Sequence, residues 1–244
     1  MLRKQKVPTL TFVAACCLGV AVVAPVRAQQ AAEPPLKELR SWTLAKGDLA
    51  ASPMQPFAYG VRLELAMLRG TRWGPGVILD SVKRAAGILA QCGIRIELAR
   101  LHEFDGPRRY RYLSTPDSSE FARRTGLRKP AIFFVDDTRM EPAFEAESVG
   151  RANARSRPEM TDTVWITSGT RDLPVALAHE LVHVLANSGA HSSLPRNLMR
   201  ERTTPLNTTL APGQCSAIVS TAHANGLLDR LPPSERRRQN RVPP

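Results

Sequence analysis

Apolar and polar residues alternate along two separate stretches of the chain. Residues 61–68 (VRLELAML) and 94–101 (IRIELARL) place apolar side chains at nearly every second position, and this alternation is typical of half-buried β-strands. Between them, residues 77–93 carry apolar side chains at helical spacing, and Gly93 is a natural C-terminal stop for a helix. The pattern therefore predicts a strand, a helix and a second strand in this order.

Two shorter apolar runs predict further strands. Residues 131–137 (AIFFVDD) follow Pro130 and fit a buried strand, and residues 163–167 (TVWIT) fit a fourth strand. A short helix is expected over residues 118–127, whereas residues 138–162 have the composition of a loop.

Two more helices are predicted in the second half of the chain. The first covers residues 172–189, with Asp172 as its N-cap and Pro174 in its first turn. The second covers residues 212–228. Together with the strands, these helices predict an α/β (α+β) domain in which helices pack on a twisted mixed sheet.

The first residues have the layout of a secretory signal peptide. A basic start is followed by an apolar run and then by Val26-Arg27-Ala28, a small-residue cleavage site. We therefore predict a signal peptide over residues 1–28 and a secreted or periplasmic protein. A permanent transmembrane helix and lipid anchoring at Cys16 are the alternatives that this segment leaves open.

The remaining chain is long enough for one domain with a hydrophobic core. We expect an irregular N-terminal extension over residues 29–58, in which residues 36–44 could form a short helix. The folded domain is expected to cover residues 59–230. The Arg-rich and Pro-flanked residues 231–244 are expected to form a basic disordered tail.

The net charge bears on possible partners. The chain has a formal charge of +12, and removal of the four basic residues of the leader lowers this charge to +8. Such a charge permits weak electrostatic contact with an anionic cell envelope, but it is spread along the sequence, as expected for charge that serves solubility. We expect no nucleic-acid partner and a monomeric protein.

The cysteines are consistent with export. Of the four, Cys16 and Cys17 leave with the predicted signal peptide. Cys92 and Cys215 remain, an even number in an oxidising compartment, so we predict a disulfide between them. Two unpaired buried thiols are the alternative.

The most informative stretch is ALAHELVHVLANSGAH, residues 176–191. His179 and His183 are four residues apart and project from one face of the predicted helix, so both imidazoles can reach one ion at about 2 Å. Glu180 is turned away from that face and can instead reach a water molecule, whose pKa a zinc ion lowers toward neutrality. This arrangement predicts a Zn²⁺ site with Glu180 as general base.

The neighbouring residues indicate that this site is buried. Leu181, Val182, Val184 and Leu185 wrap most of the helix, and burial of an unpaired imidazole or carboxylate is costly unless a bound cation offsets the cost. An amphipathic helix with its histidines on the solvent-facing side is the alternative.

The third ligand must come from beyond the helix. A catalytic zinc usually has three protein ligands and one open position. His191 is the leading candidate, but a continuous helix would carry it out of reach, so the helix must end first. Gly189 is expected to take a positive φ there and to turn the chain back. Glu201 is the alternative third ligand.

Residues 179–191, followed by NLM at 197–199, resemble the motifs of the metzincin superfamily of zinc metallopeptidases. The resemblance implies Glu180 as general base and Met199 as the methionine of a tight turn beneath the zinc. The zinc ligands that it implies are His179, His183 and His191.

The resemblance also implies an architecture: a twisted mixed sheet, a metal-binding active-site helix, a methionine turn and a C-terminal helix. In that family the strand before the metal helix, here residues 163–167, borders the cleft and pairs with an extended peptide substrate. The chain departs from the family pattern in three ways. His191 comes two residues late, no Tyr follows Met199, and no cysteine precedes the domain in a latency motif.

These observations predict an exported zinc metalloendopeptidase, with a protein or peptide as substrate and residues 59–230 as its catalytic domain. A cell-wall peptide hydrolase is a second hydrolytic interpretation. A non-catalytic, zinc-stabilised binding protein is a third, and it would keep the histidines without needing Glu180.

Overall fold

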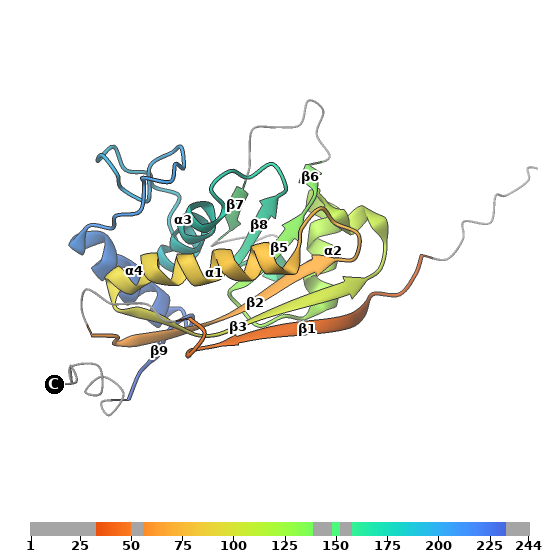
Figure 1. Cartoon of the computed structure of the whole chain (residues 1–244), viewed down its shortest axis with the longest axis horizontal. Coiled ribbons are helices and arrows are strands. Elements are labelled where there is room, and N and C mark those ends of the chain that lie inside the picture. Colours follow the sequence, from red (N-terminus) through yellow and green to blue (C-terminus); the bar gives the residue numbers. More distant parts are fainter. Residues whose placement is uncertain (1–32, 50–55, 139–147, 152–157, 233–244) are drawn as a thin grey trace, which may run out of the picture. The chain divides into compact units, whose positions relative to one another are not determined.

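The computed structural model describes residues 33–49, 56–138, 148–151 and 158–232 (Figure 1). The predicted signal peptide, with Cys16, and nearly all of the predicted basic tail lie outside these ranges. Within them, no helix combines the length and the apolar character that a membrane span requires.

The fold is built on a seven-stranded mixed sheet with the order β1-β3-β2-β5-β8-β7, in which β9 also pairs with β2. Strands β3, β2, β5 and β8 run parallel, whereas β1, β7 and β9 run antiparallel to their neighbours. The strands are β1 (Lys37–Ala45), β2 (Tyr59–Leu68), β3 (Ile94–Asp105), β5 (Ala131–Val135), β7 (Ser148–Arg151), β8 (Thr163–Thr167) and β9 (Asp229–Arg230). A small second sheet pairs β4 (Tyr112–Leu113) with β6 (Asp137–Thr138). The predicted α/β fold with a twisted mixed sheet is confirmed.

The four predicted helices are also present, with ends that differ by a few residues. They are α1 (Pro75–Leu89), α2 (Thr115–Thr125), α3 (Leu173–Ala186) and α4 (Pro212–Ala224), and short 3-10 turns form at η1 (Ala90–Cys92), η2 (Arg108–Arg111) and η3 (Pro158–Met160). Helix α3 packs against both α1 and α4 (Figure 1). Asp172 takes the N-cap position of α3 with a φ of 51°, but its side chain makes no capping hydrogen bond.

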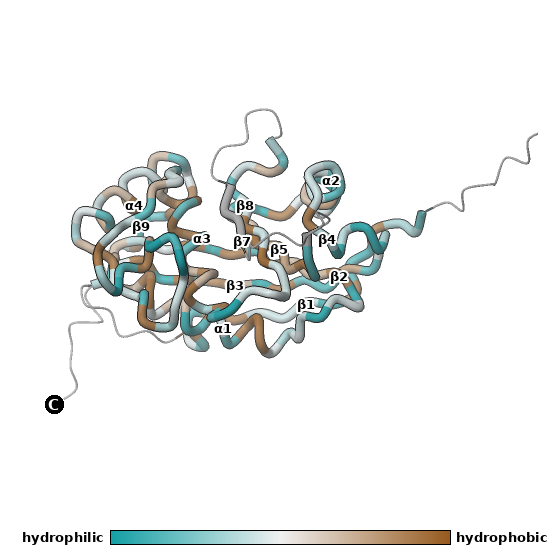
Figure 2. The backbone as a smooth tube through the Cα atoms, turned by 90° about the horizontal axis from the view of Figure 1, so that it is seen from above, coloured by the Kyte–Doolittle hydropathy of each residue, from teal (hydrophilic) through white to brown (hydrophobic). Residues whose placement is uncertain are grey.

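The central strands are buried on both faces of the sheet. In β8, Val164 and Ile166 belong to the hydrophobic cluster under α1 and α3, whereas Trp165 belongs to the cluster that contains Phe121 of α2. Phe133 of β5 stacks on Trp165 with the ring centroids 4.3 Å apart. In Figure 2 the tube is brown, and therefore hydrophobic, at β5, whereas brown and teal stretches alternate along α3. Double coverage explains why β5 is apolar throughout and why all five residues of β8, including Thr163 and Thr167 at its ends, are buried.

Residues 37–45 form the edge strand β1, where the sequence suggested an irregular segment with a short helix. That prediction was wrong because β1 carries almost no hydrophobic pattern. Only Trp42 and Leu44 reach the core, and the remaining side chains are exposed. The strand forms instead through backbone pairing with β3, and its exposed charged side chains are typical of an edge that is protected from aggregation.

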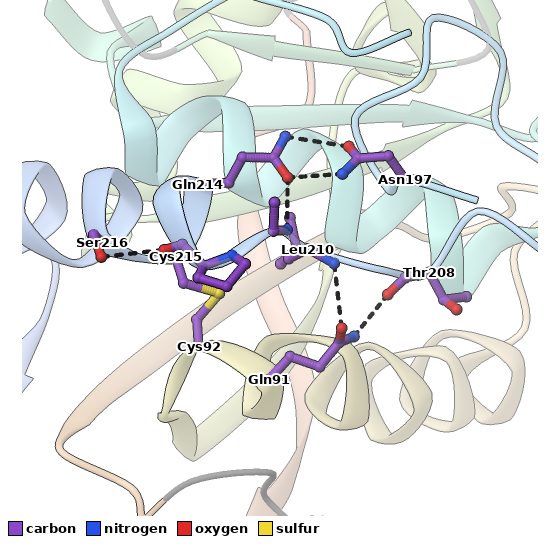
Figure 3. Close-up of a disulfide and its surroundings, with 10 residues drawn as sticks. Gln91, Cys92, Asn197, Thr208, Leu210, Gln214, Cys215 and Ser216 are labelled. Carbon is purple, nitrogen blue, oxygen red and sulfur yellow. Dashed lines mark hydrogen bonds between the residues drawn. A yellow bond between two sulfur atoms is a disulfide. The ribbon is translucent and has the colours of Figure 1, made fainter. Parts of the chain in front are cut away.

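The predicted disulfide between Cys92 and Cys215 is present (Figure 3). The two Cα atoms are 4.8 Å apart, and the residues are separated by 123 positions, so the bond ties the chain at the end of α1 to α4. In the chain-entropy model, closing a loop of this length stabilises the fold by about 5 kcal/mol. A disulfide is also compatible with the predicted export.

Candidate metal centre

Helix α3 carries the first two histidines of the motif and is buried along nearly its whole length. It packs against α1, α4, β7 and β8. His179 is 3% exposed, Glu180 is 7% exposed and His183 is 8% exposed. The alternative of a helix with solvent-facing histidines is therefore wrong. Three buried polar side chains need partners that offset their loss of water.

His179 and His183 face each other across one helical turn, as predicted. Their Nε2 atoms are 2.9 Å apart. The other ring nitrogen meets a backbone carbonyl in each case: Nδ1–H of His179 donates to Leu198 at 2.8 Å, and Nδ1–H of His183 donates to Ser188 at 2.7 Å. Because a carbonyl oxygen can only accept, both Nδ1 atoms carry the hydrogen.

This arrangement fits a bound metal cation. In the neutral rings both Nε2 atoms lack a hydrogen, so their two lone pairs face each other with the nitrogens 2.9 Å apart. This contact is repulsive unless the two nitrogens share a proton or a cation. Burial lowers the pKa of His179, although the bond to Leu198 and the charge of Glu180 act in the opposite direction. A lowered pKa disfavours the shared proton and keeps the Nε2 lone pair available to a metal.

His191 joins the pair from the segment that follows α3. Its ring centroid lies 5.4 Å from that of His179 and 5.0 Å from that of His183. The ligand atoms of the three residues all lie within 4.8 Å of one another, and His191 is the exposed member of the group. Glu201, the alternative ligand, is exposed and lies outside this group in the described part of the chain.

The end of α3 brings His191 back toward the helix. The residue with a positive φ is Asn187, at 47°, and not Gly189, so the prediction for Gly189 was wrong. Asn tolerates the left-handed conformation because its short polar side chain can hydrogen-bond locally. Ser188 then donates its N–H to the carbonyl of His183, and its own hydroxyl accepts the N–H of Ala190. These bonds close the helix and start the return of the chain.

The turn that contains Met199 meets the histidines through its backbone. The Leu198 carbonyl accepts the hydrogen bond from His179, and the Met199 carbonyl accepts the N–H of Ser192 at 2.6 Å. The Met199 side chain is buried in the main hydrophobic cluster. The structure thus brings the backbone of the Met199 turn to the histidine cluster, while the role of Met199 as the floor of a zinc site stays a prediction.

Strand β8, residues 163–167, precedes α3 but is not an edge of the sheet. It pairs with β5 on one side and with β7 on the other, so the prediction that it offers a free edge to substrate was wrong. Among the described strands, β7 is the last on this side, and it lies beside α3. It falls in the region 138–162 that was expected to be a loop, and its four residues are too few for a periodic pattern.

Sequence reasoning missed the groups that orient the histidines. Leu198 and Ser188 orient the histidines through their backbone carbonyls. Every residue has such a group, so the residue type does not reveal this role. Asn197 and Gln214 bond each other beside Met199. The available signal was Gln214 at the third position of a helix that begins with Pro212, where a side chain often caps the N-terminus.

Comparisons with known proteins add little to this geometry. No protein-family model matches the chain, and no curated protein matches it. Among solved structures, metalloproteinase-II from Bacteroides fragilis is similar over 70% of this chain, with 14% sequence identity and a TM-score of 0.47. The matched part of this chain spans 56% of the length of that structure. The fold and the site define an α/β protein with a three-histidine group that could hold a metal ion.

Proposed function

We propose that this protein is an exported zinc-dependent peptidase that hydrolyses peptide bonds in a protein or peptide substrate. The observation that carries the proposal is the convergence of His179, His183 and His191, with the first two rings turned by backbone carbonyls so that their Nε2 lone pairs meet. Three imidazoles are a known donor set for catalytic zinc, and they leave a fourth position open to water or substrate.

The bound ion would supply Lewis acidity, which polarises a substrate carbonyl and lowers the pKa of a water molecule. Glu180 directly follows His179 in the buried helix. Its carboxylate accepts the proton of the attacking water and later delivers it to the leaving amine, as a general base and acid. Glu180 is 7% exposed, so burial of α3 limits the contact of this carboxylate with bulk water.

The sheet edge beside α3 offers a place for an extended peptide. An edge strand presents unpaired backbone N–H and C=O groups, to which a peptide can add as a further strand. Strand β7 is the outermost described strand on this side and lies beside α3. In this scheme the substrate backbone pairs with β7, which places its carbonyl groups near the histidine cluster and tolerates many side chains.

The proposed setting is outside the cytoplasm. It rests on the predicted signal peptide at residues 1–28 and on the disulfide between Cys92 and Cys215. We expect no nucleic-acid partner, a monomer, and at most weak electrostatic contact with an anionic envelope. A cell-wall peptide hydrolase would use the same chemistry on peptide cross-links.

The variant Glu180→Gln tests the proposal on the purified mature protein. Turnover of a mixed peptide library should fall by about 10²–10⁴-fold, because the proton acceptor is lost, while the zinc content by elemental analysis stays at the wild-type level. Wild-type activity should disappear with a chelator and return with zinc. A zinc-loaded wild-type protein without any turnover would identify a non-catalytic binding protein, and a wild-type protein that takes up no zinc would refute the proposal altogether.

A further inference from the structure

One short turn holds two histidine-bearing segments at the same time. The carbonyl of Leu198 accepts Nδ1–H of His179 at 2.8 Å. The carbonyl of the next residue, Met199, accepts the N–H of Ser192 at 2.6 Å, and Ser192 directly follows His191. Two consecutive carbonyl groups therefore set the orientation of one ring and the path of the chain beside another.

The side chain of Asn197 fixes the orientation of this turn. Its Oδ1 accepts the N–H of Met199 at 2.9 Å. That N–H belongs to the same planar peptide group as the carbonyl of Leu198, so one amide side chain fixes the plane of the peptide that binds His179. Asn197 is 3% exposed, and water cannot readily replace it as the acceptor.

Gln214, in the first turn of α4, holds Asn197 in turn (Figure 3). Nδ2 of Asn197 donates to Oε1 of Gln214 at 2.7 Å, and Nε2 of Gln214 donates to Oδ1 of Asn197 at 3.2 Å. A separate backbone N–H fixes the orientation of each side-chain amide. The N–H of Met199 donates to Oδ1 of Asn197, and the N–H of Ala211 donates to Oε1 of Gln214 at 2.8 Å. The two fixed orientations are complementary, so neither amide can flip without losing bonds.

The start of α4 is itself anchored to the body of the fold. Cys215, the neighbour of the glutamine in α4, forms the disulfide with Cys92. Gln91 donates from Nε2 to the carbonyl of Thr208 at 2.6 Å and accepts the N–H of Leu210 at Oε1 at 3.2 Å (Figure 3). The amide pair thus connects the turn to a segment that is fixed covalently and by hydrogen bonds to the end of α1.

We propose that Asn197 and Gln214 are positioning residues of the metal centre, because their amide pair holds the peptide of Leu198 in the orientation that directs Nε2 of His179 at the ion. This inference rests on the proposed zinc site. The outer partners of a metal-bound histidine are typically worth tenfold to a hundredfold in metal affinity. Among the described residues, the Gln214 amide bonds Asn197 and Ala211 and no histidine, so its effect on zinc passes through Asn197.

Zinc affinity of the full chain tests the inference, measured by competition with a chromophoric chelator. Asn197→Ala should weaken zinc binding by about tenfold to a hundredfold. Gln214→Ala should weaken it by a smaller factor, and the double variant should be no weaker than Asn197→Ala, since the two residues act in series. The visible spectrum of the Co²⁺-substituted protein should also change in Asn197→Ala, because the His179 ring is no longer held in one orientation.

Asn207→Ala is the matched control. Asn207 is another buried asparagine of the same segment, and its side chain donates to the carbonyl of Arg202 at 2.9 Å, away from the turn. This variant should lose stability but keep the wild-type zinc affinity and cobalt spectrum.

Three results would overturn the inference. The first is a wild-type zinc affinity in Asn197→Ala or, if that variant does not fold, in Gln214→Ala. The second is an equal loss of zinc affinity in Asn207→Ala. The third is a wild-type protein that binds no zinc, which alone would overturn the proposed function as well.

Discussion

Helix α3 and the segment 187–211 build the candidate metal centre in different ways. The helix is buried and regular, and it places His179 and His183 by its periodicity. The segment contains no helix or strand, only an isolated bridge between Asn197 and Thr209, and much of it is exposed. The segment nevertheless contributes His191 to the histidine group, and it contributes the carbonyl of Leu198, which orients the ring of His179.

The difference shows two routes to a precise site. In α3 the positions of side chains follow from 3.6 residues per turn, and packing maintains them. In the segment 187–211 each position depends on individual hydrogen bonds to groups that are distant in the sequence, such as those between Asn197 and Gln214. The irregular part of the site is therefore as well determined as the helix, but by a different set of residues.

Removal of the disulfide should have the largest effect on stability. The double variant Cys92→Ala with Cys215→Ala should lower the free energy of unfolding by about 5 kcal/mol, because the unfolded chain regains the entropy of an open loop. Denaturant titration measures this change. Amide hydrogen exchange should also accelerate more in residues 187–211 than in α3, since the segment loses its anchor while the helix stays packed. Equal acceleration in both regions would contradict the role of the anchor.

Removal of one histidine from each region compares their contributions to metal binding. His183→Ala and His191→Ala should each weaken zinc binding by more than about a hundredfold, beyond the range expected for an outer partner. Isothermal titration with zinc measures both values. His223→Ala is the control, because His223 of α4 lies outside the metal-binding group. If His191→Ala binds zinc as the wild type does, the exposed histidine is not a ligand.

A smaller effect is expected at the junction of the two regions. Asn187 has a φ of 47° where α3 ends. Asn187→Ala should cost about 1–2 kcal/mol of stability, because a Cβ without a polar group is disfavoured in this conformation. Asn187→Gly should be neutral or slightly stabilising, since Gly adopts it without strain. The midpoints of thermal unfolding separate the two variants, and an alanine variant as stable as the glycine variant would argue against a left-handed end of the helix.

The fold could be predicted where burial imposes a pattern. Strands β5 and β8 are covered on both faces, so β5 is continuously apolar and β8 is apolar between its two terminal threonines, and α1 repeats its apolar residues at helical spacing. Strand β1 was missed because its side chains are mostly exposed, and β7 because it has four residues. Both strands pair through their backbones with a neighbour, and the local sequence does not encode this pairing.

The candidate site shows the same division. The helical spacing of His179 and His183 predicts their convergence, and the need to end the helix before His191 was foreseen. The residue that ends it was not, because Asn187 and Gly189 both suit a left-handed turn and only the hydrogen bonds of Ser188 distinguish them. The identity of the metal and the proton transfer by Glu180 stay predictions.

The order of elements along the chain has a consequence for biogenesis. Both the carbonyl of Leu198 and the half-cystine at Cys215 come after every strand of the main sheet except β9. A polypeptide emerges from the ribosome N-terminus first, so the sheet can begin to assemble well before these two groups exist. The three-histidine group therefore lacks the bond from Leu198 and the anchor at Cys215 until this late part of the chain has been made and has docked. If the proposed function holds, activity would accordingly appear only after this late segment has docked on the sheet and α3.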